Sequence, residues 1–275
     1  MTIIKQESSH FYSREGAPAY DSKMKEIREL GHIPSATTIL GAANSWALNE
    51  WQKKQVALAC LLVPMPGGYG RTRPIGADQA AEEEEATWMS ARIADAGEVV
   101  KKFADFGSKF HDGAEAILNG DEWDREDAWL VKFDEWAQAN IVNTIWTEKC
   151  LVHPSYLFAG RADAYVEHQA HGAILLDFKT RKLRQLKSGK YSAASNRYDK
   201  DIRQLAAYSD CMDQKPAVMN LYIHRDEAVE PAEYLWGSEA QEQGLKAFLA
   251  LANYWCLDKK YDPRAWVPAE EEVAA

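Results

Sequence analysis

The chain of 275 residues, 46% hydrophobic and 27% charged, has the composition of a globular protein with enough apolar mass for a core. Its net charge of −10 argues at first against a polyanionic partner, and no apolar run approaches the roughly 18 residues of a membrane span. The four cysteines form no CxxC pair, which disfavours a zinc or iron–sulfur site. Because the segment MTIIKQESSH lacks the apolar core of a signal peptide, we expect a cytoplasmic protein.

The N-terminal half is predicted to be helical. Ser35 and Thr37 place hydroxyl groups just ahead of an apolar segment, as the N-cap of a helix does. The predicted elements of this half are a helical stretch through Trp51 and Leu58, a Pro- and Gly-rich loop over 63–76, a long helix from about Ala80 to Leu118 and a helix over 127–140. Apolar residues recur in the long helix at steps of three and four from Val99 to Ile117, so we expect that face to be buried.

The pattern changes to strands near Ile145. The predicted elements are strands over 145–152, 157–168 and 173–178, a helix over 199–213, strands over 218–224 and 232–236, and a last helix over 237–257. The order is therefore helices followed by β-β-β-α-β-β-α, in a single domain spanning 1–275. Within it, 55–98 forms a helical insertion, and the acidic end at 270–275 predicts a disordered tail.

Charge is segregated along the chain. Nine Lys or Arg residues lie between Lys179 and Arg203, against two aspartates, whereas seven acidic residues and only one arginine lie in 77–98. A chain with this distribution can hold phosphate at one place and repel it at another. The alternative is that both segments are ordinary solvated faces.

The segment ILLDFKTRK at 174–182 joins an apolar strand to charged residues. Side chains alternate along a strand, so Asp177 and Lys179 point to one face and Phe178 to the other. The chain has four D-x-K triplets, and only this one follows an apolar strand. Charges at the end of a buried strand must be hydrated, paired or bound to an ion, and an ordinary ion pair is the alternative to a functional site.

A second carboxylate is expected beside Asp177. The segment GRADA places Asp163 inside a strand, and a hairpin through 168–172 would bring it next to Asp177. Two adjacent carboxylates repel unless a cation lies between them, and Mg²⁺ prefers carboxylates, water and phosphate oxygens as ligands. Lys179 could then stabilise negative charge on a phosphoryl transition state, or orient or deprotonate the attacking water. Glu148 on the preceding strand is a further candidate, as ligand or general base.

Two helices contribute further candidates. His111 lies on the long helix, where a lone histidine is more often structural than a ligand. Gln204 and Tyr208 lie four residues apart on one helical face, either as a polar rim or as an amide and a phenol that hold a nucleic-acid backbone.

Taken together, these motifs resemble the PD-(D/E)XK nuclease superfamily, and within it the RecB-like exonuclease group. GRADA, ILLDFKT and QLAAY match its ordered pattern of G-x-x-D, D-x-K and Q-x-x-x-Y, and FGSKFHDGAEAIL resembles its upstream G-x-x-x-H helix. The segment IPSATTIL is similar to an entry segment in phage exonucleases and in the mitochondrial genome maintenance exonuclease. The resemblance spans roughly Pro34 to Tyr208.

The resemblance implies an α/β, restriction-endonuclease-like core, in which helices flank a central mixed sheet. It implies metal ligation by His111, Asp163, Asp177 and the carbonyl of Phe178, with Mg²⁺ or Mn²⁺ as cofactor and no iron–sulfur cluster. Lys179 would be the catalytic lysine, together with Asp177 and Asp163, while Glu148 is either the family's first acidic position or only a strand residue. The residues expected to contact nucleic acid are Gln204, Tyr208, Arg181, Lys182, Ser35 and Thr37.

The expected function is a metal-dependent DNA exonuclease that acts on ends or single strands in phage or bacterial recombination, repair or replication. It would work in the bacterial cytoplasm or that of a phage-infected host, with a recombination or single-strand-binding protein as a candidate partner. One alternative is a nucleic-acid-binding or recombination-accessory module without turnover, which predicts salt-sensitive binding without metal dependence. The other is a restriction-type endonuclease.

Overall fold

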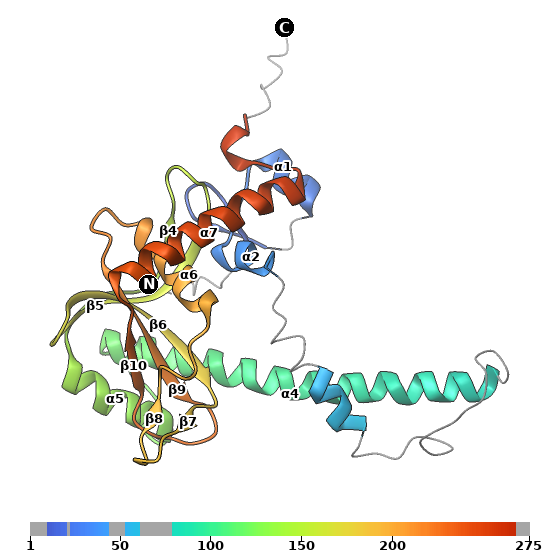
Figure 1. The fold of residues 1–275 in the computed structure, drawn as a ribbon, viewed down its shortest axis with the longest axis horizontal. Coiled ribbons are helices and arrows are strands. Elements are labelled where there is room, and N and C mark those ends of the chain that lie inside the picture. Colours follow the sequence, from blue (N-terminus) through green and yellow to red (C-terminus); the bar gives the residue numbers. More distant parts are fainter. Residues whose placement is uncertain (1–9, 21–22, 44–52, 61–78, 268–275) are drawn as a thin grey trace, which may run out of the picture. The chain divides into compact units, whose positions relative to one another are not determined.

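The computed structural model describes residues 10–20, 23–43, 53–60 and 79–267 (Figure 1). The chain divides into two compact units, one made of 1–43 with 109–275 and the other of 44–108. The described parts of the second unit are a helical stretch at 53–60 and the first part of helix α4 (Gln79–Asn119), which continues into the first unit. The predicted loop at 63–76 and the predicted tail at 270–275 lie outside the described residues, and the single domain with an insertion at 55–98 stays a prediction.

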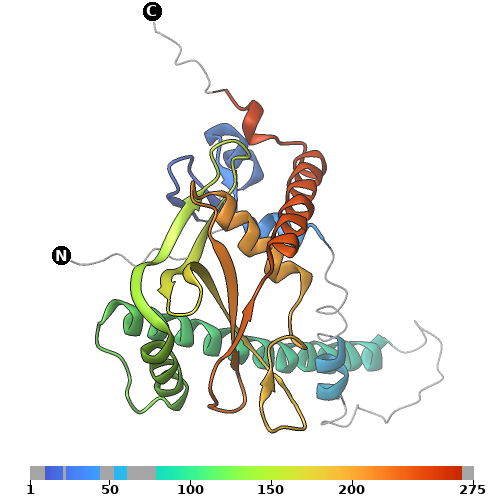
Figure 2. The same cartoon turned by 60° about the vertical axis from the view of Figure 1, so that its left-hand side comes forward.

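A mixed five-stranded sheet forms the centre of the first unit, so the α/β class with a mixed central sheet is confirmed. The strands are β4 (Ile141–Val152), β5 (Ala159–His168), β6 (Gly172–Arg181), β9 (Ala217–His224) and β10 (Ala232–Leu235). Their order is β10-β9-β6-β5-β4, and only the β6–β9 pair is parallel (Figure 2). Helix α6 (Asp199–Asp210) lies on the connection between these two strands, as a parallel pair requires.

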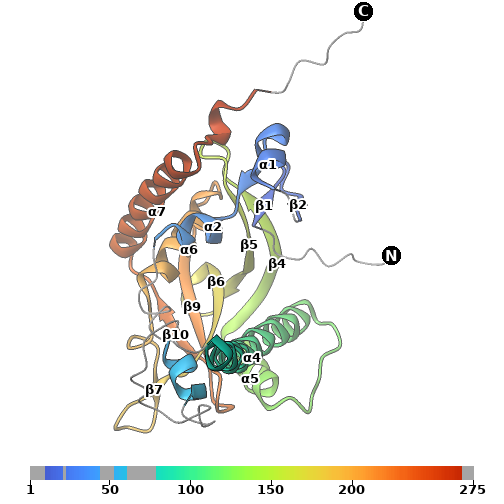
Figure 3. The same cartoon turned by 90° about the vertical axis from the view of Figure 1, so that its right-hand side faces the viewer.

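Helices cover both faces of the sheet (Figure 3). On one face, Leu175 and Val218 pack against α6, α7 (Ser238–Lys259) and α2 (Ala36–Gly41). On the other face, Phe178 and its neighbours pack against α5 (Ala128–Asn140) and against Phe110 and Ala114 of α4. The alternation of strand side chains therefore supplies two separate cores, one on each side of the sheet.

The remaining elements are short. The N-terminal segment forms a three-stranded sheet and a helix: β1 (Phe11–Tyr12), β2 (Pro18–Ala19), β3 (Ile33–Pro34) and α1 (Met24–Leu30). A hairpin of β7 (Arg184–Gln185) and β8 (Tyr191–Ser192) follows β6, and the 3₁₀ helix η1 (Pro263–Ala265) follows α7. Among the described residues, no helix is both long and apolar enough to cross a membrane.

Three predicted details differ from the structure. Strand β4 begins at Ile141, four residues before the predicted start, because it follows α5 without a loop. Strand β6 continues to Arg181, since the ladder with β9 holds its polar end as far as Arg181↔His224. Within the predicted buried face of α4, Phe110 and Ala114 are buried, but Val99 is 37% exposed because it precedes the part of α4 that packs in the first unit.

Candidate functional site

Four polar side chains lie in register across four neighbouring strands. In the β4–β5 ladder, Thr147 pairs with Ala164 and Lys149 with Ala162, which places Glu148 opposite Asp163. The β5–β6 ladder ends at Ala164↔Leu176, so Asp163 and Asp177 are the next residues on their strands. Asp177 in turn pairs with Asn220 of β9. The hairpin predicted from the sequence therefore brings the two aspartates together, and Glu148 and Asn220 extend the row on either side.

The strands β5 and β6 separate at the two aspartates. Beyond Ala164↔Leu176 no further pair continues the ladder, and the Phe178 N–H donates instead to Oδ2 of Asp163, at 2.6 Å. A side-chain carboxylate thus takes the place of a backbone carbonyl and satisfies a donor that the ladder would otherwise have bound. We call this divergence of β5 and β6 the fork, and the line of Glu148, Asp163, Asp177 and Asn220 the row. At the fork, side chains from the helices on both faces of the sheet can reach the row.

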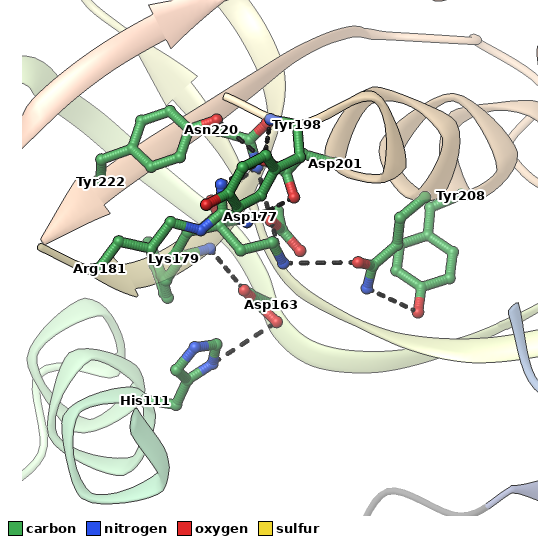
Figure 4. Close-up of polar contacts among 12 residues, drawn as sticks. His111, Asp163, Asp177, Lys179, Arg181, Tyr198, Asp201, Tyr208, Asn220 and Tyr222 are labelled. Carbon is green, nitrogen blue, oxygen red and sulfur yellow. Dashed lines mark hydrogen bonds and ion pairs between the residues drawn. The ribbon is translucent and has the colours of Figure 1, made fainter. Parts of the chain in front are cut away.

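His111 reaches the fork from α4. Its Nδ1 lies 3.7 Å from Oδ1 of Asp163 and 3.9 Å from Oε1 of Glu148, as Figure 4 shows for Asp163. These separations are too long for hydrogen bonds. Two ligand atoms that are each about 2.1 Å from one ion lie at most about 4.2 Å apart, so both separations fit atoms that share an ion. Among the described residues, His111, Glu148 and Asp163 are the group whose donor atoms could hold a metal ion, all within 4.8 Å of one another.

The backbone conformation of Glu148 and an ion pair with Arg161 fix its carboxylate near His111. Its backbone has φ +45°, a left-handed conformation that is unfavourable for a residue with a side chain and is unusual inside a strand. Its Oε2 accepts from Nε of Arg161 at 2.5 Å, which leaves Oε1 facing His111. The sequence left open whether Glu148 is a ligand, a general base or neither, and the structure places it in the group whose donor atoms could hold a metal ion.

Asp177 is the most enclosed of the three acids in the row, and it lies outside the group of His111, Glu148 and Asp163. It is 2% exposed, and its Oδ2 accepts from Nζ of Lys179 at 2.5 Å and from Nδ2 of Asn220 at 2.6 Å. Asn220 is fully buried, and its Oδ1 accepts from the indole N–H of Trp236 at 2.7 Å. Because the indole can only donate, it fixes the amide so that the NH₂ group faces Asp177. The chain from Trp236 through Asn220 thereby holds one oxygen of Asp177 in a single orientation.

The amide and the phenol predicted on α6 complete the site. Gln204 Oε1 accepts from Lys179 Nζ at 3.4 Å, and Gln204 Nε2 donates to the Tyr208 hydroxyl at 3.3 Å. Tyr208 is buried against Gly160, where a Cβ atom would lie 2.5 Å from the tyrosine ring. The glycine of the G-x-x-D motif therefore provides the space for the tyrosine of the Q-x-x-x-Y motif.

Burial and neighbouring charges set the protonation of the site. Burial raises the pKa of Asp177 to about 6 against the opposing effect of Lys179, and burial also raises the pKa of Asp163. For Lys179 and His111, burial lowers the pKa, but the neighbouring carboxylates outweigh it and the net shift is upward. Lys179 is therefore an ammonium. Two adjacent carboxyl groups with raised pKa mark a place where further positive charge is stabilising.

Arg181 and Lys182 differ from one another in the structure. Both guanidinium NH₂ groups of Arg181 donate to Asp201 of α6, at 2.7 and 2.6 Å, and the guanidinium lies over the rings of Tyr198 and Tyr222. Lys182 is exposed, and within the described part of the chain its nearest carboxylate is that of Asp226, at 3.9 Å. The charge of Arg181 is thus engaged inside the protein, while that of Lys182 faces solvent.

Ser35 and Thr37 begin helix α2. Ser35 Oγ accepts from the Thr38 N–H at 3.0 Å, which is the N-cap predicted from the sequence. Ser35 is buried and bridges to Ala159, next to Gly160, whereas Thr37 is exposed. The predicted contacts of these hydroxyl groups with nucleic acid, and that of the Phe178 carbonyl with a metal, stay predictions.

The residues that sequence reasoning missed are the supporting ones: Asn220, Trp236, Asp201 and Arg161. Asn220 left a signal, because it is a lone polar residue inside the apolar strand AVMNLYIH. Asp201 left a weaker one, as the third helical residue of a capping box with Tyr198. Arg161 and Trp236 carry no local signal, since their roles depend on the register of other strands.

No protein-family model matches this chain, and no curated protein shows significant sequence similarity to it.

Proposed function

We propose that this chain is a divalent-metal-dependent nuclease with a restriction-endonuclease-like fold, which hydrolyses phosphodiester bonds of DNA at ends or in single strands. The observation that carries the proposal is the row of Glu148, Asp163 and Asp177 at a fork of the sheet, with an ammonium at Lys179. The motif resemblance supports the same reading, because its G-x-x-D, D-x-K and Q-x-x-x-Y residues are in mutual contact.

The donor set fits a hard divalent cation. Carboxylate oxygens of Glu148 and Asp163 suit Mg²⁺ or Mn²⁺, and the imidazole of His111 shifts the preference toward Mn²⁺. A bound cation would supply positive charge to the scissile phosphate and would acidify a water molecule. The ion would also favour the charged forms of Asp163 and Asp177, whose pKa values are raised mainly by burial and further by the neighbouring carboxylates.

The side chains of the site then orient the Lys179 ammonium and stabilise negative charge on the phosphoryl group. The raised pKa of Lys179 makes it a poor base at neutral pH and a good donor, which favours the stabilisation of phosphoryl oxygens over the deprotonation of water. Gln204 accepts from the Lys179 ammonium and so limits its orientations. Asp177 fixes the lysine from the other side, with its carboxylate held by Asn220.

The test is cleavage of end-labelled DNA with Mg²⁺ or Mn²⁺ by the wild type, Asp177→Ala and Lys179→Ala. We expect each substitution to lower the rate by about 10²-fold or more, the usual cost of removing a group that stabilises a transition state. Lys246→Ala on the exposed face of α7 is the matched control and should retain the wild-type rate. Equal rates in all four proteins would reject the proposal.

The alternatives predicted from the sequence give different results in the same assay. An accessory module would bind DNA without metal-dependent turnover. A restriction-type endonuclease would cut covalently closed circular DNA at defined positions, whereas an enzyme that requires ends would leave circular single strands intact and degrade the same molecules after linearisation.

A further inference from the structure

The segment from Lys182 to Arg197 carries five Lys or Arg residues and no acidic residue, in a chain whose net charge is −10. It forms the hairpin of β7 and β8, here named the basic hairpin, at the opposite end of the first unit from α1 and α7 (Figure 1). It begins three residues after Lys179, as a direct continuation of β6.

The basic hairpin has one packed face and one solvated face. Leu183 and Ala193 are buried with Tyr222, and Tyr191 packs against the ring of His224 and donates to Glu227. Arg184 pairs with Ser192 one register position away, so these two side chains point to the opposite face. All five cations are exposed: Lys182, Arg184, Lys187, Lys190 and Arg197, of which Arg197 lies over the rings of Tyr234 and Trp236.

The root of the basic hairpin is tied down. Asn196 accepts from the Arg184 N–H at 3.0 Å and donates to the Lys182 carbonyl at 2.8 Å, so one side chain clamps the two ends. Arg181 donates to the Asn196 carbonyl at 2.6 Å and is itself held by Asp201. The ion pair therefore anchors the hairpin to α6, and a ligand would bind a surface that is already ordered.

The exposed cations are not neutralised within the described part of the chain. No described carboxylate lies within 4.0 Å of Arg184, Lys187 or Lys190, and the Lys182–Asp226 pair is long and exposed on both sides, so it contributes little. Glu227 accepts from the Tyr191 hydroxyl. An acidic protein thus presents a fixed, uncompensated positive surface beside its candidate site.

We propose that the basic hairpin binds the phosphates of the nucleic-acid strand that flank the scissile bond, and that Arg181 anchors the hairpin instead of contacting phosphate. The identity of the polyanion rests on the proposed function. A strand rises about 3.3 Å per residue, so Lys182 and Arg184 follow Lys179 by about 10 and 17 Å. Measured along the helix axis of a duplex, this distance covers about three to five phosphates of one strand.

The experiment compares the full-length wild type with a triple variant, Arg184→Gln with Lys187→Gln and Lys190→Gln. Binding to fluorescent 25-nucleotide single-stranded and duplex DNA is measured in EDTA over a range of salt concentrations. We expect the affinity of the variant to fall about tenfold or more at about 0.1 M salt. Each lost contact removes about 0.7 (single strand) to 0.9 (duplex) from the slope of log K against log salt, so three contacts should reduce it by about 2 to 3.

The matched control removes three exposed lysines elsewhere, Lys25→Gln with Lys246→Gln and Lys259→Gln, on α1 and α7. It has the same net charge as the hairpin variant and should keep the wild-type affinity and slope. Equal affinity and slope in the two triple variants would overturn the proposal. If the hairpin variant does not fold, acetylation of the wild type decides instead: DNA should protect Lys187 and Lys190 but not Lys246, and equal acetylation with and without DNA would be the contrary result.

These measurements require no hydrolysis, so they separate the two proposals. Metal-dependent cleavage by the wild type, with unchanged DNA binding in the hairpin variant, would support the proposed nuclease activity and reject the proposed role of the basic hairpin. Loss of binding in the hairpin variant, with no cleavage by the wild type under any metal, would do the reverse.

Discussion

The orientation of Asp177 depends on a single buried amide. Asn220 has one partner on each side, with Trp236 donating to its oxygen and its NH₂ group donating to Asp177. Hydrogen bonds to a charged acceptor contribute about 1.5–3 kcal/mol, and a buried group left without its partner loses about 1–3 kcal/mol. The amide therefore couples the stability of the β9 region to the geometry of the site.

We predict that Asn220→Leu lowers turnover by about tenfold or more, because Asp177 then keeps only Lys179 as a partner for Oδ2. It should also destabilise the fold by about 2–4 kcal/mol, since the Trp236 indole loses its acceptor in a buried place. Trp236→Phe is the graded control, because it removes the indole donor and leaves the amide. Steady-state kinetics should show the loss in kcat with little change in KM, and a fall confined to KM would contradict the positioning role.

A second residue-scale prediction concerns Gly160. Gly160→Ala should destabilise the protein by about 1–3 kcal/mol, the usual cost of overpacking, because the new methyl group lies 2.5 Å from the Tyr208 ring. The cost should shrink in a Tyr208→Ala background, which a double-mutant cycle in urea measures directly. Gly237→Ala, with nothing within 4 Å of the added atom, is the matched control. Additive effects of the two changes would show that the glycine serves another purpose.

At the scale of elements, the ion pair between Arg181 and Asp201 joins β6 to α6. Asp201 is fully buried and also accepts from the Tyr222 hydroxyl at 3.2 Å and from the Tyr198 N–H at 3.0 Å. Burial raises the pKa of Asp201, but the bonds from Arg181 outweigh it and hold that pKa below its usual value. The pair thus fixes the strand that carries Lys179 against the helix that carries Gln204.

We predict that Asp201→Asn destabilises the protein by about 3 kcal/mol at pH 7, because it leaves the Arg181 guanidinium enclosed without a counter-charge. A carboxyl with a lowered pKa stabilises the fold above its unfolded pKa of about 3.9, and this stability is lost as the pH falls through the folded pKa. The difference in the free energy of unfolding between wild type and Asp201→Asn should therefore narrow below about pH 4. Urea unfolding at pH 7, 5 and 3 measures it, and a gap that is constant with pH would contradict the assignment.

The sequence predicts the order of the elements better than the residues at which they begin and end. The strands with the apolar runs at 157–168, 173–178 and 218–224 are found within a few residues of their predicted places, because the apolar pattern of each strand predicts its own burial. The end of β6 at Arg181 depends on its pairing with β9, and the start of β4 on the end of α5. Such boundaries are set by partners distant in sequence, so local pattern does not determine them.

The candidate site shows the same division. Asp163, Asp177, Lys179, Gln204 and Tyr208 were predicted from motifs and come together in the structure. The role of Glu148 was open, since no local residue pattern marks its left-handed backbone or its place opposite Asp163. The anchoring of Arg181 was missed, because its partner lies twenty residues away on another element.

At the scale of the whole molecule, the site brings together His111, Glu148 and Asp163, whose donor atoms could hold a metal ion. A ligand that binds only the native state raises stability by RT ln(1 + [L]/Kd), which is about 2.7 kcal/mol at one hundred times Kd. Protons compete for the same groups, since the pKa values of His111 and Asp163 are raised.

We predict that saturating Mn²⁺ raises the midpoint of thermal unfolding by about 5 °C or more at pH 8, relative to EDTA, and by less at pH 6. His111→Ala should abolish most of this shift. His171→Ala, at an exposed histidine outside the site, is the control and should keep it. Differential scanning fluorimetry gives the midpoints, and an equal shift in both histidine variants would place the ion elsewhere.

A substitution at Asp163 is a poor way to make an inactive variant of the proposed nuclease. Its carboxylate binds the Phe178 N–H where the ladder between β5 and β6 ends, so removing it also takes away a backbone partner from the strand that carries Lys179. An alanine at this position would confuse a chemical defect with a displaced strand, and an asparagine could turn its oxygen to the amide and restore part of the bond. For trapping a complex of the proposed nuclease with uncleaved substrate, Lys179→Ala is the cleaner substitution, because the backbone of residue 179 remains in the β6–β9 ladder.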